Sequence, residues 1–92
     1  MSSSIILPAR LDLSEAQSLH KEMTKLDMSS EIVCNAAAVT HVGAICVQTL
    51  IAAARSALDA GGKLTLENVS ERVEKQLAAM GLSSQAVMEG AR

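Results

Sequence analysis

The fold is decided by residues 31–67, which read EIVCNAAAVTHVGAICVQTLIAAARSALDAGGKLTLE. Residues 31–35 contain a continuous rather than alternating apolar run, which is typical of a strand buried on both faces. Residues 63–67 alternate polar and apolar side chains and predict a strand with one exposed face or an edge position. The helical pattern between them ends at Gly61-Gly62, a strong stop signal. Strand, helix and strand in this order predict parallel pairing through a helical crossover.

The expected helix in the middle of this stretch carries its apolar residues at helical spacing. The residues of this stripe are Val42, Ile45, Cys46, Thr49, Leu50, Ala53 and Ala57. We expect the stripe to face the sheet, and we expect the residues at 36–41 to form the loop that leads into the helix.

Toward the N-terminus, residues 4–7 form a short apolar run that Pro8 ends, which predicts a first strand. A helix is expected from about Ser14 to Leu26. Ser14 is followed three residues later by Gln17, which has the pattern of a capping box at a helix start. This segment adds a strand and a crossover helix before residue 31.

Toward the C-terminus, Ser70 is the expected N-cap of a third helix that Gly81 closes. Residues 85–88 predict a short last strand, and residues 89–92 a frayed tail. The complete pattern predicts an α/β fold with a small, mostly parallel sheet of about four strands and three helices. The whole chain, residues 1–92, is expected to form one domain.

Composition limits the classes of partner. The 92 residues include no Phe, Tyr or Trp, so there are no aromatic rings on which nucleic-acid bases could stack. Eight basic and ten acidic residues give a net charge of −2, and no basic stripe is visible. Binding to nucleic acid or to an anionic membrane surface is therefore not expected.

The longest uncharged stretch, residues 32–54, is long enough to suggest a membrane span. It contains Asn35, His41 and Gln48, which argue against insertion into a bilayer. Residues 1–6 lack the basic start and the long apolar run of a signal peptide. We therefore expect a cytoplasmic protein.

Few residues are arranged for chemistry. Cys34 and Cys46 do not have the spacing of a redox or zinc motif, and with His41 they offer only three ligands, fewer than a structural zinc site requires. Neither His20 nor His41 lies in a motif with a nucleophile and an acid. Gly61-Gly62 precedes a strand and does not form a phosphate-binding loop. We expect no metal, no cofactor and no enzymatic activity.

The most informative segment is the expected start of the second helix, at residues 39–50. In open parallel α/β sheets, ligands meet the carboxyl ends of strands and the first turn of the following helix. Here the helix starts with the small residues Gly43, Ala44 and Cys46. These residues allow close approach, either of a partner or of the helix to its own sheet, and spacing alone does not decide between the two.

Four motifs in order resemble the STAS domain, the module of anti-sigma factor antagonists and sulfate-transporter tails. Residues 7–16, LPARLDLSEA, resemble the family's entry into its first helix, and residues 39–42, VTHV, resemble the segment before its switch loop. Residues 60–66, AGGKLTL, and residues 77–82, LAAMGL, resemble a later strand and the closing motif. The resemblance implies a STAS-like fold. Family members commonly begin with an additional strand, for which residues 1–4 are too short.

The switch loop departs from the family pattern. The family usually reads D-S-S-G or D-T-x-G there, and phosphorylation of a serine in this loop abolishes partner binding. The matching residues are 43–46, GAIC, and Ile45 stands where the phosphorylated serine would be. The resemblance therefore implies docking without phosphorylation of this loop. Thr40 and Thr49 flank the loop and remain possible phosphate acceptors.

The variant V-G-A-x-C-x-Q-x-L at residues 42–50 resembles STAS proteins of alphaproteobacterial chemotaxis gene clusters. This resemblance implies that the partner is a chemotaxis histidine kinase and that the chain assists phosphate drainage from the response regulators. Apolar side chains such as Val47 and Ile51 are expected to be exposed there, with Cys46 and Leu50 supporting them from beneath. The expected partner-binding residues are His41, Gly43, Ala44, Ile45, Val47, Gln48 and Ile51.

Two alternatives remain. One is an accessory STAS subunit of an ABC lipid transporter, although such subunits usually keep the D-T-x-G loop. The other is an anti-sigma factor antagonist acting on a serine kinase, for which residues 43–46 offer no hydroxyl group.

Overall fold

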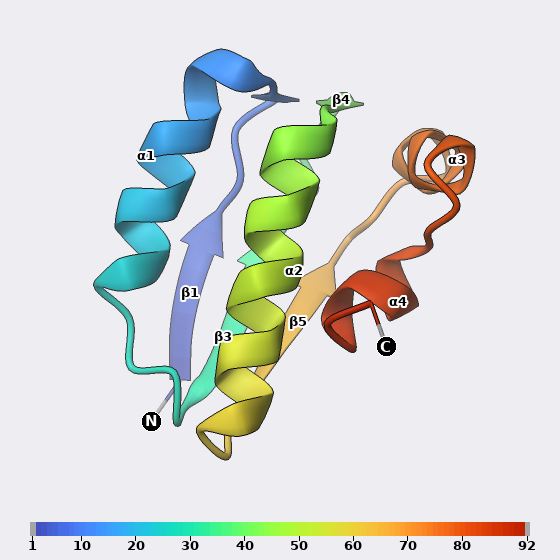
Figure 1. Cartoon of the computed structure of the whole chain (residues 1–92). Helices are drawn as coiled ribbons and strands as arrows, with labels where there is room; N and C mark the ends of the chain where they lie inside the picture. Colours follow the sequence, from blue (N-terminus) through green and yellow to red (C-terminus); the bar gives the residue numbers. More distant parts are fainter. Residues whose placement is uncertain (1, 92) are drawn as a thin grey trace.

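The computed structural model describes residues 2–91, which contain a three-stranded sheet, a separate two-stranded sheet and four helices. Figure 1 shows the chain coloured along the sequence. The elements are β1 (Ser2–Ile6), β2 (Arg10–Leu11), α1 (Leu13–Thr24), β3 (Glu31–Asn35), β4 (His41–Val42), α2 (Ala44–Asp59), β5 (Lys63–Glu67), α3 (Glu71–Ala79) and α4 (Ser84–Met88).

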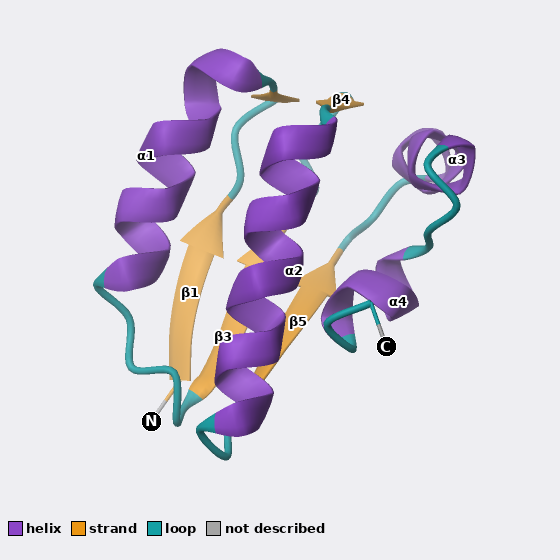
Figure 2. Cartoon of the chain, viewed as in Figure 1, coloured by secondary structure: helices purple, strands orange, loops and turns teal. Residues whose placement is uncertain are grey.

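The main sheet has the strand order β1-β3-β5, and both pairs are parallel. The chain crosses from β1 to β3 through α1 and from β3 to β5 through α2, and both helices cover the same face of the sheet (Figure 2). The predicted α/β class and the parallel pairing are confirmed. The strands at residues 31–35 and 63–67 have the predicted bounds, and β5 is an edge strand.

The two faces of the sheet differ in burial. On the helix-covered face, Ile32, Cys34 and Leu64 are buried in the core. On the opposite face, Val33 and Thr65, which are partners in the strand register, are only half-buried. The prediction that residues 31–35 are buried on both faces is therefore wrong, because only one face is packed under α1 and α2.

Helix α1 begins one residue earlier than predicted, and its cap is Asp12 rather than Ser14. The Asp12 carboxylate accepts hydrogen bonds from the Ser14 backbone N–H at 3.1 Å and from the Ser14 hydroxyl at 2.6 Å. This satisfies one of the free N–H groups of the first turn. The helix ends at Thr24, so Leu26 packs against the core from the following loop.

Helix α2 lies close to the sheet because alanines occupy the contact. Its buried residues are Cys46, Val47, Leu50, Ala53, Ala54 and Ala57. Val47 replaces Ile45, which the sequence placed in the buried stripe and which is exposed in the structure. The helix is thus rotated about its axis relative to the prediction.

The predicted stop at Gly61-Gly62 is confirmed, and the two glycines serve different purposes. Gly61 has φ +89°, a left-handed conformation that glycine adopts without strain. A Cβ atom on Gly62 would lie 2.3 Å from the Ser30 carbonyl oxygen and 2.4 Å from that of Met28. No side chain fits at Gly62, because the backbone of the loop before β3 passes directly against it.

The C-terminal part was predicted less well. Ser70 caps α3 as expected, since its hydroxyl accepts a hydrogen bond from the Val73 N–H at 3.2 Å. The segment predicted as a last strand is the helix α4. The tail is not frayed at Gly90, which is buried and whose carbonyl accepts a hydrogen bond from Arg55 at 2.9 Å. Arg92 lies outside the described residues.

Candidate functional site

The two-stranded sheet positions the start of α2. Strands β2 and β4 pair in parallel, with Arg10 opposite His41 and Leu11 opposite Val42. The Thr40 N–H donates to the Ala9 carbonyl at 2.8 Å, and the Gly43 N–H donates to the Leu11 carbonyl at 2.7 Å. These bonds hold the segment that enters α2 against the segment that enters α1, so the two helix starts form one unit.

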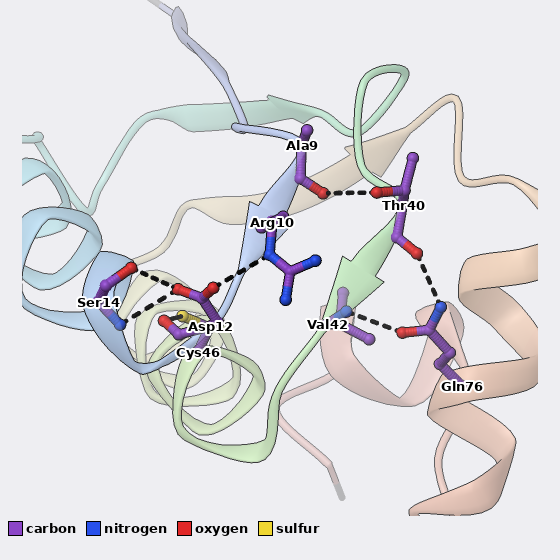
Figure 3. A network of polar contacts seen from close by, with 8 residues as sticks. All are labelled: Ala9, Arg10, Asp12, Ser14, Thr40, Val42, Cys46 and Gln76. Carbon is purple, nitrogen blue, oxygen red and sulfur yellow. Dashed lines mark hydrogen bonds and ion pairs between the residues drawn. The ribbon is translucent and has the colours of Figure 1, made fainter.

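A glutamine of α3 holds the other side of this segment (Figure 3). The Gln76 amide nitrogen donates to the Thr40 carbonyl at 2.9 Å, and the Gln76 amide oxygen accepts from the Val42 N–H at 2.8 Å. One side chain therefore takes the place of a further strand beside β4. Sequence analysis did not single out Gln76, because its role depends on residues more than thirty positions away.

Asp12 and Cys46 connect the starts of α1 and α2. The buried Cys46 thiol donates to the Asp12 carbonyl at 3.2 Å, while the Asp12 carboxylate forms an ion pair with Arg10 at 3.3 Å (Figure 3). The hydrogen bond from the Ser14 hydroxyl and the Arg10 side chain lower the pKa of Asp12 below its ordinary value. Cys46 thus acts as a small core residue with a hydrogen-bond partner, not as an exposed thiol.

Five of the seven predicted partner-binding residues are accessible and adjacent. We call them the α2 tip, and they are His41, Gly43, Ala44, Ile45 and Gln48. His41 and Gly43 are half-buried, whereas the other three are exposed, with Ile45 exposed to 50%. A Cβ atom on Gly43 would lie 3.2 Å from the Leu11 carbonyl oxygen, so glycine allows the close contact between β2 and the helix start.

The remaining two predicted residues, Val47 and Ile51, differ from each other in burial. Val47 is exposed to only 2% and belongs to the core, beneath α2. Ile51 is half-buried and packs against the same core. The expectation that Val47 is exposed is therefore wrong, and Ile51 is only partly accessible, whereas Cys46 and Leu50 are buried as expected.

The tip offers little reactive chemistry. Residues 43–48 contain no hydroxyl group, and the two flanking threonines are engaged: Thr40 donates to the Ala9 carbonyl at 3.2 Å and Thr49 to the Ile45 carbonyl at 3.0 Å. Burial raises the pKa of the Cys46 thiol. Burial also raises the pKa of Cys34 to about 11, so both thiols stay protonated at neutral pH. Within residues 2–91, no three His, Cys, Asp or Glu side chains gather to hold a metal ion.

Two features beside the tip were missed by sequence analysis. Leu13, the first residue of α1, is exposed to 78%. An open groove of about 440 Å³ extends away from the tip between α1 and α2, and its lining includes Ile45, Gln48, His20 and Met23. Sequence could have pointed to Leu13, because it is a leucine directly after the residue that caps the helix.

The fold and this site define a small α/β domain with an accessible helix start beside a parallel sheet. Comparison with known protein families matches residues 5–88 to the STAS domain, so the chain belongs to the STAS domain family. No curated protein matches the chain. Among the described residues, 2–91, no helix is both long enough and apolar enough to cross a membrane.

Proposed function

We propose that the chain is a non-catalytic docking module whose α2 tip binds a chemotaxis histidine kinase and thereby assists phosphate drainage from the response regulators. The observation that carries the proposal is the character of the tip, which is accessible, has no acidic, Lys or Arg side chain and is free of available hydroxyl and thiol groups. Ile45 supplies an exposed apolar side chain at the tip, and Leu13 supplies a second one at the start of α1, which the bond from Cys46 to Asp12 joins to the start of α2. Exposed apolar side chains that gather at one place are typical of protein contacts.

The support for a kinase as the partner comes from sequence. Residues 42–50 resemble the STAS variant of chemotaxis gene clusters, in which Gly43, Cys46 and Gln48 have counterparts. The structure gives two of these residues a reason: Gly43 allows the close contact with Leu11, and Cys46 bonds the Asp12 carbonyl. Gln48 has an exposed side chain on the tip, where a partner can reach its amide.

The proposal is tested by calorimetry with the purified chain and the cognate kinase. Ile45→Glu places a charge at the tip, and it favours folding because a carboxylate in the first turn of a helix interacts well with the helix dipole. The matched control is Leu58→Glu, which changes an apolar side chain exposed to 40% on the same helix, about 20 Å from the tip. We expect Ile45→Glu to weaken binding at least tenfold and Leu58→Glu to leave it unchanged.

The control variant Leu58→Glu is expected to be the less stable of the two, because a carboxylate in the last turn of a helix costs about 0.3–1 kcal/mol of stability. A loss confined to Ile45→Glu is therefore not an effect of unfolding. Equal affinities for both variants and the unchanged chain would show that the tip is not the kinase contact. Binding to a transporter ATPase instead of the kinase, or ATP-dependent modification at residues 40–49 by a serine kinase, would favour the two alternative STAS functions.

A further inference from the structure

Strand β1 leaves one edge of the main sheet open. The Leu7 N–H donates to the Asn35 carbonyl at 2.9 Å, toward β3. Because backbone groups alternate in direction along a strand, the N–H and C=O groups of Ser4 and Ile6 point away from β3. Among residues 2–91 no strand lies on that side, since β1 is the end of the order β1-β3-β5.

This edge lacks the features that prevent strand addition. Residues 2–6, SSSII, contain no charge and no proline, and Ile6 is exposed to 79%. Proteins usually protect an open edge with charged residues, proline, a bulge or a covering element. The opposite edge strand, β5, begins with Lys63, ends with Glu67 and is contacted by α4.

Two carboxylates of α1, those of Glu15 and Glu22, lie beside the open edge, and we call this pair the acidic wall. A shallow groove between β1 and α1 is lined by Ile5 and by two carboxylates of α1, Glu15 and Glu22. These are seven residues apart on one face of the helix, about 10 Å along its axis. Within residues 2–91 neither carboxylate takes part in a hydrogen bond or ion pair, whereas those of Asp12, Glu31, Glu71, Glu74 and Glu89 all do.

We propose that the β1 edge binds an extended basic segment of a partner protein, which adds to the sheet as a further strand. Backbone groups of the segment bond those of Ser4 and Ile6, and its Lys or Arg side chains reach Glu15 and Glu22. The residues of the segment that alternate with these basic ones lie on the face of the sheet away from α1, beside the exposed Ile6 side chain, and are apolar. The sequence that this site recognises therefore alternates basic and apolar residues.

The charges favour such a segment over a second copy of this chain. In a symmetric dimer through this edge, each copy would insert its own β1, residues 2–6, into the groove of the other. That strand has no basic side chain to pair with Glu15 or Glu22. The inference does not rest on the proposed function, because the β1 edge and the α2 tip share no residue.

The test uses the ¹⁵N-labelled chain and an acetylated, amidated hexapeptide, KVKVKV, at low ionic strength. We expect the amide signals of Ser4 and Ile6 to shift and their hydrogen exchange to slow. The matched peptide EVEVEV should bind at least about tenfold more weakly, because it repels the acidic wall. A KVKVKV peptide methylated at every backbone nitrogen keeps its charge but has no backbone N–H donors for strand pairing, and it should not bind.

Variants of the chain separate charge from strand pairing. The double variant Glu15→Gln with Glu22→Gln should weaken KVKVKV about two- to tenfold. Glu67→Gln removes an exposed carboxylate at the opposite edge and should have no effect. Ser4→Pro removes an N–H that points outward, so β1 still pairs with β3 while strand addition is blocked.

Three outcomes would overturn the proposal. The first is equal binding of the methylated and unmethylated peptides, and the second is a Ser4→Pro variant that remains folded and binds normally; either would show that no strand is added. The third is self-association of the free chain through Ser4 and Ile6, which would identify a second copy as the occupant.

Discussion

Two apolar residues at the start of α2, Ile45 and Val47, differ in burial and should respond differently to truncation. Val47→Ala removes two carbon atoms from a side chain exposed to 2%. At about 0.8 kcal/mol per buried methylene, plus a cavity contribution, it should lower the free energy of unfolding by about 2–3 kcal/mol. Ile45→Ala removes three carbon atoms, but the side chain is half-exposed, so the expected loss is about 1 kcal/mol or less.

Urea denaturation followed by circular dichroism at 222 nm measures both losses, since the chain has no Trp or Tyr for fluorescence. With a slope of about 1 kcal/mol per molar urea, the midpoint should fall by about 2 M or more for Val47→Ala and by about 1 M or less for Ile45→Ala. Affinity for the partner should fall for Ile45→Ala and stay unchanged for the folded Val47→Ala. Equal midpoint shifts, or a binding loss confined to Val47→Ala, would refute the assigned rotation of α2.

Further outcomes follow from single contacts. Gly62→Ala should destabilise the chain by about 3 kcal/mol or more, because its Cβ meets backbone atoms, whereas Gly61→Ala should cost only about 1–2 kcal/mol of left-handed strain; the comparison of their melting curves checks this. Gln76→Leu leaves the Val42 N–H without an acceptor and should cost about 1–3 kcal/mol, with faster hydrogen exchange at that amide as the specific sign. The pKa of Asp12 is lowered on folding, so its carboxylate stabilises the fold above its ordinary pKa of 3.8, and this contribution is lost as the pH falls through the lower folded value. Carboxyl NMR should therefore report a folded pKa below 3.8 for Asp12. In the Ser14→Ala variant that pKa should rise, because the hydrogen bond from the Ser14 hydroxyl is removed.

Sequence was sufficient for the elements with strong local signals. Strands β3 and β5, the end of α2 just before Gly61 and the cap of α3 at Ser70 lie where the pattern placed them. Each depends on neighbours in sequence: continuous or alternating hydrophobicity, a glycine pair, or a hydroxyl at a helix start. The short pair β2–β4 has no such signal, because two-residue strands are fixed by tertiary contacts alone.

Sequence placed helix α2 correctly along the chain but did not fix which of its sides is buried. Helix α2 contains apolar residues on nearly every side, including Ile45, Val47, Ile51 and a run of three alanines at 52–54. A pattern with so little polar contrast does not fix which side faces the sheet. Tertiary packing determines the orientation, with the smaller Val47 in the core and Ile45 exposed.

The hydrogen bond from Cys46 to Asp12 and those of Gln76 with Thr40 and Val42 have a consequence for binding at the α2 tip. A surface already locked from three directions has little freedom left to lose, so association there carries a small entropic penalty. The unbound and bound backbones should then nearly superimpose. In the proposed complex, such a surface would favour a partner whose shape already matches it.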